Sequence, residues 1–77
     1  MTMLLNRQWQ FVQSSNITAI AYDEPSQKLF IQFNNGSTYE YYQVPSETYE
    51  DLMRAESQGK FFNQYIKKRF DYNRIEN

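Results

Sequence analysis

The sequence predicts an α+β fold, in which a three-stranded antiparallel meander is followed by two helices packed on one face of the sheet. Segments 17–22, 28–34 and 37–43 carry apolar or aromatic side chains at alternate positions, as one face of a strand does. Asn35-Gly36 separates the second segment from the third and is a strong hairpin signal. After the third segment, apolar residues recur at helical spacing. Strands that precede helices favour an antiparallel sheet with its helices gathered on one face.

Composition limits the protein to one small domain of 77 residues. There is no cysteine and no histidine, so disulfides are excluded, and the commonest metal ligand and general base are missing. Eight basic and nine acidic side chains give a net charge of −1, which leaves room for a local basic patch but does not by itself indicate nucleic-acid binding. Aromatic residues make up 18% of the chain, enough for some rings to serve a binding surface as well as the core.

The first strand is predicted at residues 17–22, followed by a turn at residues 23–26. Strict alternation would place Ile20 and Tyr22 on one face of this strand. The other face would hold Ile17, Ala19 and Ala21. Pro25 favours the turn because its φ is fixed, and the neighbouring Asp and Ser side chains bond to local backbone.

The register of the following hairpin decides which side chains share a face. A two-residue loop would place Glu40 on the face of Ile31. A three-residue loop with Gly36 in a left-handed conformation would keep Glu40 off that face. The facing pairs would then be Ile31 with Tyr39 and Leu29 with Tyr41. We expect the three-residue loop, because it gathers the apolar side chains on one face and a one-residue slip would reverse this.

A first helix is predicted to open at Val44-Pro45-Ser46, with Ser46 as its N-cap. Glu47 and Glu50 would lie in the first turn, where the helix dipole favours acidic side chains. Its buried stripe would consist of Tyr49, Leu52 and Met53.

A break is predicted at residues 57–59, where Gly59 would adopt the left-handed conformation that ends a helix. A second helix is predicted from Lys60 to Lys68. One of its faces would hold Phe62, Tyr65, Ile66 and Arg69. The tail, residues 71–77, is predicted to contribute two anchoring side chains, Tyr72 and Ile75.

Several short motifs follow one another along the chain, each occurring once. They are Ser14-Ser15-Asn16-Ile17, Tyr22-Asp23, Leu29, Ile31, Phe33, Asn35-Gly36, Tyr39, Tyr41, Val44-Pro45, Ser57, Gly59-Lys60 and Phe62-Asn63. In this order they resemble the KTSC domain, a small module named for its place at the C-terminus of some lysyl-tRNA synthetases. The resemblance implies a KTSC-like domain over residues 12–77 in a stand-alone protein, preceded by an extension over residues 1–11. It also implies nucleic-acid binding, a role suggested for the family by its context.

The extension carries apolar side chains that need partners. They could add an edge strand to the sheet, cap the core or pair with a second chain, and residues 9–13 favour the edge strand. Phe30 and Tyr42 lie on the sheet face without helix cover, which suggests contact with the extension or with a partner chain. A homodimer could therefore form through Phe30, Tyr42 and residues 1–11.

Signatures of catalysis are nearly absent. Ser14 and Ser15 have no base nearby in the sequence, and together with Asn16 they are most simply a turn before the first strand. The acidic pairs Asp23-Glu24 and Glu50-Asp51 have no spacing that picks them out as a catalytic dyad or a calcium loop. We expect a protein that is not an enzyme and has no cofactor or metal. No apolar run is long enough to span a membrane, so we also expect a cytoplasmic protein without a membrane partner.

Gly59-Lys60, at the start of the predicted second helix, is one candidate anion site. A helix N-terminus offers free backbone donors, Gly59 allows close approach, and Ser57 could either cap the helix or bind the anion. The phosphate-loop spacing is missing, and capping is the simpler interpretation.

Lys67-Lys68-Arg69 is the only concentration of positive charge, and aromatic residues interleave it. Cations that hold phosphates among rings that stack on bases are typical of single-strand binders, although a solvated helix end has the same composition. Tyr39 and Tyr41 would face the helices and could offer their hydroxyls to a phosphate or ribose.

These residues predict a non-enzymatic binding module for a phosphate-bearing ligand, most simply RNA or another nucleic acid. Its phosphates would meet Lys60, Lys67, Lys68 and Arg69, with Ser57 and Gly59 at the helix start. Stacking or hydrogen bonds would come from Tyr39, Tyr41 and Asn63. The alternatives are a protein that sequesters a small signalling nucleotide, as some small phage proteins do, and a protein-interaction module that uses residues 1–11.

Overall fold

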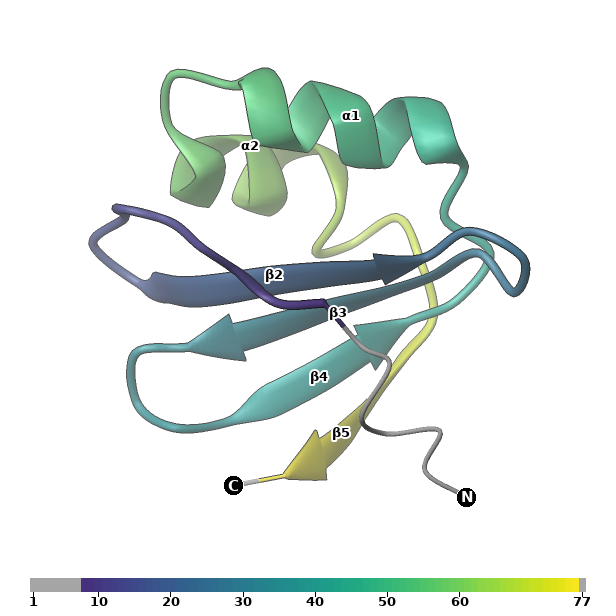
Figure 1. The fold of residues 1–77 in the computed structure, drawn as a ribbon, viewed down its shortest axis with the longest axis horizontal. Helices are drawn as coiled ribbons and strands as arrows, with labels where there is room; N and C mark the ends of the chain where they lie inside the picture. The colour runs from purple at the N-terminus through teal and green to yellow at the C-terminus, as the bar shows by residue number, and fades with distance from the viewer. Residues whose placement is uncertain (1–7, 77) are drawn as a thin grey trace.

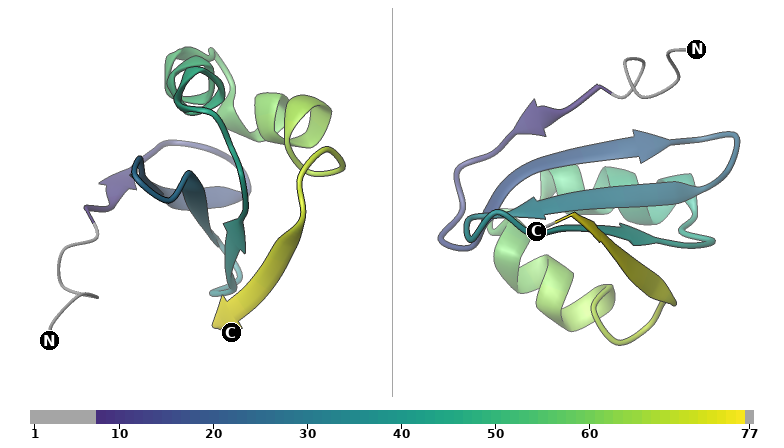
Figure 2. Two further views of the ribbon diagram at one scale, coloured as in Figure 1. Left: turned by 90° about the vertical axis from the view of Figure 1, so that its right-hand side faces the viewer. Right: turned by 90° about the horizontal axis from the view of Figure 1, so that it is seen from below.

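The protein consists of two layers, a five-stranded antiparallel sheet and two helices on one of its faces (Figure 1). The computed structural model describes residues 8–76. The strands follow one another across the sheet in chain order. They are β1 (Gln10–Phe11), β2 (Ile17–Asp23), β3 (Lys28–Phe33), β4 (Thr38–Tyr41) and β5 (Tyr72–Glu76), and the helices are α1 (Ser46–Arg54) and α2 (Gln58–Tyr65). Two further views show both helices above the same face of the sheet (Figure 2).

Two edge strands extend the predicted three-stranded meander to five strands. β1 pairs with β2, with Gln10 opposite Ile20, which confirms an N-terminal edge strand shorter than residues 9–13. β5 pairs with β4 at the other edge, with Tyr72 opposite Tyr41, and the sequence did not predict it. The described side chains of β5 are exposed, so burial leaves no alternating pattern there. The open edge of β4 binds the tail through main-chain hydrogen bonds instead.

A bulge in β2 corrects the predicted alternation of its side chains. The register shifts between Ile17 and Ala19, so that Ile17 lies opposite Phe33 while Ile20 lies opposite Ile31. Ile17 and Ile20 therefore both reach the core, although strict alternation predicts opposite faces for them. Burying an isoleucine side chain stabilises the folded protein by about 1.5–3 kcal/mol. This exceeds the roughly 0.5–1.5 kcal/mol net contribution of one ladder hydrogen bond, which a bulge can disrupt.

The predicted register of the β3–β4 hairpin is confirmed. Ile31 lies opposite Tyr39 and Leu29 opposite Tyr41. Gly36 has a φ of 93°, which a glycine adopts without the steric cost of a Cβ. The Phe33 backbone N–H donates to the Ser37 carbonyl at 2.8 Å and closes the loop.

α1 does not begin with the predicted serine cap. Its N-cap is Pro45, whose backbone is extended and whose carbonyl accepts from the N–H groups of Thr48 and Tyr49. Ser46 is instead the first helical residue, because the fixed φ of proline suits the entry into the helix one residue earlier. The predicted stripe is confirmed, since Leu52 is buried and its two partners are half-buried against the core.

Gly59 lies inside α2 and does not end a helix. Ser57 is the N-cap, and its hydroxyl accepts from the Lys60 backbone N–H at 3.2 Å. Gly59 is buried against the turn that precedes β2. A Cβ at this position would lie 2.5 Å from Oδ1 of Asn16 and 3.2 Å from Oγ of Ser14. The glycine is therefore needed for close approach between two segments that are far apart in the sequence.

α2 ends at Tyr65, earlier than the predicted Lys68, and residues 66–69 form turns. Phe62 and Ile66 are buried as predicted, but Tyr65 is 44% exposed and Arg69 is exposed too, so the predicted four-residue face is only half correct. Within residues 8–76, neither helix has the length and apolar character needed to cross a membrane.

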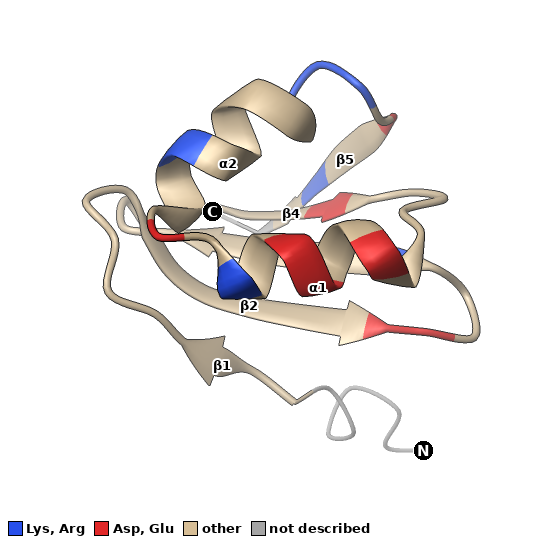
Figure 3. Ribbon diagram, turned by 90° about the horizontal axis from the view of Figure 1, so that it is seen from above, with Lys and Arg blue, Asp and Glu red and all other residues tan. Residues whose placement is uncertain are grey.

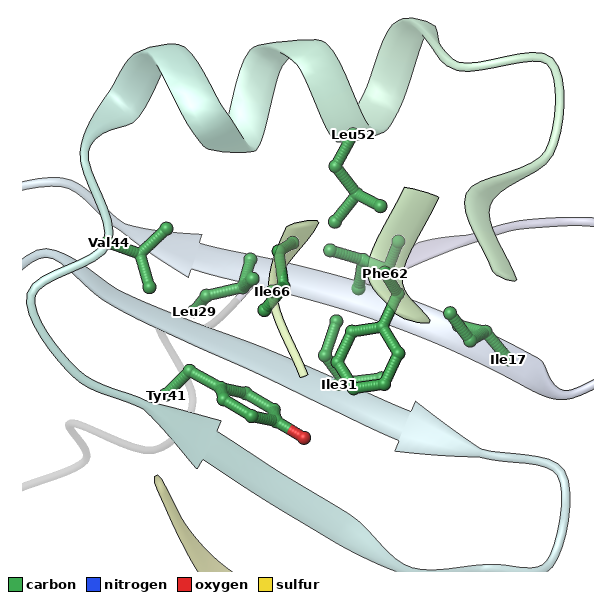
Figure 4. Close-up of a cluster of buried hydrophobic side chains, with 9 residues drawn as sticks. Ile17, Leu29, Ile31, Tyr41, Val44, Leu52, Phe62 and Ile66 are labelled. Atoms are coloured by element: carbon green, nitrogen blue, oxygen red, sulfur yellow. The ribbon is translucent and has the colours of Figure 1, made fainter. Parts of the chain in front are cut away.

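The core lies between the sheet and the two helices (Figure 4). Its fully buried side chains come from β2, β3, both helices and the segments that flank them. The cluster consists of Ile17, Ile20, Leu29, Ile31, Tyr41, Val44, Leu52, Phe62 and Ile66.

The sheet face opposite the helices is covered in part by the segment around β1. Phe30 is only 4% exposed, and the ring of Trp9 meets it edge-on with 6.5 Å between ring centroids. The hydroxyl of Tyr42 donates to a Glu40 carboxylate oxygen at 2.8 Å. The predicted contact of Phe30 with the extension is thus confirmed for Trp9. Residues 1–7 of the extension lie outside the described residues, and association with a second copy stays a prediction.

The contact between Gly59 and Asn16 leads to a prediction about stability. Gly59→Ala should lower the free energy of unfolding by about 1 kcal/mol or more, because overpacking outweighs the gain in helix propensity. In an Asn16→Ala background the same change should cost less, since the atom that the new methyl group meets is gone. Urea unfolding of the four proteins measures both costs, and equal costs in the two backgrounds would contradict the contact.

Candidate ligand-binding cleft

A cleft lies between α2, with the turn that follows it, and the β4–β5 edge of the sheet. Its volume is about 610 Å³, which is typical of sites for small molecules. The strands at this edge carry large aromatic side chains on the face that looks toward the helices. The cleft therefore begins at buried aromatic side chains of the core and opens to solvent at this edge of the sheet.

Aromatic rings form the floor and walls of the cleft. Tyr41 and Phe62 are buried and meet edge-on, with ring centroids 5.4 Å apart (Figure 4). The ring of Tyr72 lies 5.5 Å from that of Tyr41 and 5.6 Å from that of Tyr39. Tyr72 is 55% exposed and so presents part of its ring to a ligand. Two further rings, Phe33 and Phe70, complete the aromatic lining.

The polar lining combines amides with two lysines. Lys67 and Lys68 enter from the turn after α2, and Asn63 from the helix itself. Asn16 comes from the turn before β2, which contacts the start of α2, and Asn35 and Ser37 come from the β3–β4 loop. No described residue that lines the cleft is acidic. The lining can therefore attract an anion without a carboxylate to oppose it.

Charge is distributed unevenly over the molecule (Figure 3). Acidic residues gather on α1, which also carries Arg54 in its last turn. Basic residues lie on α2, in the turn after it and on β5, with the acidic Asp71 between that turn and β5. Arg74 of β5 lies opposite Tyr39, two residues beyond Tyr72, so the register places it on the same sheet face as the cleft tyrosines. A net charge of −1 thus conceals a local excess of basic residues beside the cleft.

The structure brings together five of the predicted site residues and separates the other four. Tyr39, Tyr41, Asn63, Lys67 and Lys68 all line the cleft. Arg69 lines a separate hollow with Phe61 and Tyr65. Ser57 and Gly59 serve the start of α2, as its cap and at its contact with Asn16, and Lys60 is exposed outside the cleft lining. Of the two interpretations of Ser57, the structure supports capping.

The sequence did not single out several lining residues. Phe70 and Tyr72 interleave the basic cluster, and that spacing was the one available signal for them. The sequence indicated turns at Asn16 and Asn35 and no role in a site. Asn35 does stabilise its turn, because its Oδ1 accepts from the Ser37 N–H at 2.9 Å. Nothing local indicated Phe33, which reaches the cleft because its strand lies beside β4.

Burial raises the pKa of the Tyr41 hydroxyl, and the neighbouring Tyr39 and Tyr72 add to the rise. The hydroxyl is protonated at neutral pH, as that of an ordinary tyrosine is, and can donate to an anion. Among the described residues no hydrogen bond is formed by this hydroxyl or by those of Tyr39 and Tyr72. The three hydroxyls are thus available to a ligand.

The raised pKa of Tyr41 has a consequence for alkaline stability. The unfolded chain ionises this tyrosine near pH 10, whereas the folded protein resists doing so. The contribution to stability is therefore complete below about pH 10 and is lost as the pH rises toward the folded pKa. Tyr41→Phe should unfold at nearly the same temperature at pH 7 but lose stability less steeply above pH 10. Thermal unfolding followed by circular dichroism measures this, and identical pH slopes for the two proteins would contradict it.

Known proteins resemble this chain in sequence and in structure. A family model of the KTSC domain matches residues 13–70. A protein of Tsukamurella paurometabola is 49% identical over 61 residues, which cover 79% of this chain and 91% of that protein. A lysine–tRNA ligase of Nostoc punctiforme is 40% identical over 63 residues, which are 82% of this chain but 11% of the ligase.

A solved structure agrees with these matches. The crystal structure of a KTSC domain protein from Yersinia pestis has a TM-score of 0.85 and 41% sequence identity to this chain. The alignment covers 90% of this chain and 97% of the other. The resemblance predicted from the spaced motifs is therefore confirmed, and the chain belongs to the KTSC domain family.

Proposed function

We propose that the protein is a non-enzymatic binding module for a phosphate-bearing ligand, most simply single-stranded RNA or another nucleic acid, and that the ligand binds in the cleft. The observation that carries this proposal is the pairing of Lys67 and Lys68 with a ring-lined cleft that has no acidic lining residue. Cations that hold phosphates beside rings that stack on bases are the two components of single-strand binding.

The arrangement of the rings favours stacking by a base near the mouth of the cleft. Tyr72 is half-exposed, while Tyr41 below it is buried, so a base can reach the first ring but not the second. The free hydroxyls and Asn63 can then bond to sugar or phosphate oxygens. No nucleophile with an adjacent base lines the cleft among the described residues, which favours binding over catalysis.

The sequence relatives also support binding to RNA. The matching segment forms 11% of a protein named lysine–tRNA ligase, an enzyme whose name gives tRNA as its substrate. A domain joined to such an enzyme is well placed to contact RNA, and we extend that role to this chain as part of the proposal.

Binding to RNA should depend on the two cleft lysines. With a fluorescent twelve-nucleotide uridine RNA at low salt, Lys67→Gln combined with Lys68→Gln should lower affinity by about tenfold. The plot of log affinity against log salt should become shallower by about 0.7 for each lysine that contacts a phosphate. Fluorescence anisotropy over a range of salt concentrations measures both quantities.

Lys28→Gln is the control for the single substitutions Lys67→Gln and Lys68→Gln, since each of the three removes one positive charge. Lys28 lies next to Leu29 on β3, so its side chain is on the opposite face of the sheet, where it pairs with Glu40 at 3.9 Å. Its removal changes the net charge without touching the cleft. No binding by the unmodified protein at low salt, or an affinity independent of salt, would refute the nucleic-acid function.

Stacking makes a separate prediction. Tyr72→Ala should weaken RNA binding by about 1–3 kcal/mol, the usual value of one base–aromatic stack. Tyr65→Ala is the control, because Tyr65 is similarly exposed but lies outside the cleft. Equal effects of the two substitutions in the anisotropy assay would argue against a stacking role for Tyr72.

A small signalling nucleotide is the second candidate ligand, and the volume of the cleft favours it. Thermal shift measurements distinguish the two ligands. A rise in unfolding temperature with dinucleotides but none with oligonucleotides would support nucleotide capture over RNA binding.

A further inference from the structure

Arg74 is a cation that lies next to the cleft without lining it. It stands on β5 directly opposite Tyr39, and side chains that face each other across antiparallel strands lie on the same side of the sheet. Tyr39 lines the cleft, so Arg74 lies beside the rim. Its side chain is exposed, and within the described part of the chain no carboxylate pairs with it. The guanidinium is therefore available to a ligand.

The contacts of its neighbours on β5 support this direction of the Arg74 side chain. The ring of Tyr72 lies 5.5 Å from that of Tyr41, on the cleft face of the sheet. The side chain of Asn73 meets the Tyr42 hydroxyl, on the opposite face. Alternation along the strand then returns Arg74 to the cleft face, about 6.6 Å beyond Tyr72 at a rise of roughly 3.3 Å per residue.

An acidic residue separates Arg74 from the cleft lysines in the sequence, but it belongs to the other face. The carbonyl of Asp71 accepts from the Tyr42 N–H at 2.9 Å, so the ladder continues one pair beyond Tyr72. Alternation directs the Asp71 side chain away from the cleft, whose described lining contains no acidic residue. Cations thus lie in the turn before β5 and on β5 itself, and Tyr72 comes between them along the chain (Figure 3).

A nucleotide whose base stacks on Tyr72 meets these two groups of cations differently according to its phosphates. A nucleotide inside a strand has one phosphate on the 5′ side of its sugar and another on the 3′ side. A mononucleotide has only one of the two. The side of the ring toward the turn offers Lys67 and Lys68, and the side along β5 offers Arg74. Arginine is suited to the second place, because its guanidinium binds phosphate through two parallel N–H donors.

We propose that Arg74 forms a second phosphate site, and that the protein thereby favours a nucleotide with phosphates on both sides of its sugar, as in a single strand, over a mononucleotide. This inference rests on the proposed nucleic-acid function and names the feature of the ligand that the site selects. Lys67 and Lys68 hold one phosphate, Tyr72 stacks on the base, and Arg74 holds the other phosphate.

Small uridine nucleotides isolate the second site. Uridine 3′,5′-bisphosphate carries a phosphate on each side of the sugar, and the 3′- and 5′-monophosphates carry one each. Uridine 5′-diphosphate has two phosphates on the same side and controls for charge. In competition with the fluorescent twelve-nucleotide RNA at low salt, the bisphosphate should bind about three- to fivefold tighter than the other three, as one exposed ion pair contributes. In Arg74→Gln this advantage should disappear.

The same substitution should weaken binding of the twelve-nucleotide RNA by a similar factor. The plot of log affinity against log salt should become shallower by about 0.7, the value for one phosphate contact. Arg54→Gln is the matched control, because Arg54 is exposed on α1, pairs with Asp51 at 3.0 Å and lies outside the cleft lining. It removes the same charge and should leave the affinity and the salt slope unchanged.

The outcomes separate the second phosphate site from the function beneath it. Absence of binding by the RNA and by every small nucleotide would overturn both. RNA binding that Arg74→Gln and Arg54→Gln weaken equally would overturn the second site alone, because only the overall charge would then matter. A diphosphate that binds as tightly as the bisphosphate would also overturn it, since the position of the second phosphate would have no effect.

Discussion

The register of the β3–β4 hairpin decides which face of the sheet carries the tyrosines of β4. The positive φ of Gly36 allows the three-residue loop, and that loop places Tyr39 and Tyr41 beneath the helices. A slip of one residue would turn both rings to the opposite face and bring Glu40 into the core. The buried contact between Tyr41 and Phe62 would then be lost, and with it both the packing of α2 on the sheet and the floor of the cleft.

The cleft follows from what the sheet edge offers to α2. The aliphatic core lies over β2 and β3, and toward β5 the side chains become aromatic and carry hydroxyls. Tyrosine suits this boundary, because its ring packs against the core while its hydroxyl can meet solvent or a ligand. β5 adds Tyr72 and Arg74 to the same face and so extends the surface beyond the region that the helices cover (Figure 2).

One small contact links the fold to the candidate site. Gly59 lets the start of α2 approach the turn at Ser14 and Asn16, and that approach fixes the amide of Asn16 at the end of the cleft. The charge pattern acts at the other end, where the turn after α2 brings its lysines beside the rings. The acidic residues of α1 lie on another side of the molecule, so the slightly negative net charge does not describe the cleft (Figure 3).

The local features of the chain were readable because short-range chemistry sets them. Alternation and Asn35-Gly36 predicted the central hairpin and its register, helical spacing predicted the stripe around Leu52, and spaced motifs predicted the family. Five members of the candidate site also came from sequence, since Tyr39, Tyr41, Asn63, Lys67 and Lys68 share a cleft.

Only the tertiary structure decided the features that depend on distant partners. β5 pairs because β4 leaves an open edge, and the bulge in β2 exists because the core accepts both Ile17 and Ile20. Position 59 of α2 requires a glycine because Asn16, which is distant in sequence, occupies the space that a side chain there would fill. Each of these depends on a contact between segments far apart in the chain, and such contacts have no period or motif of their own.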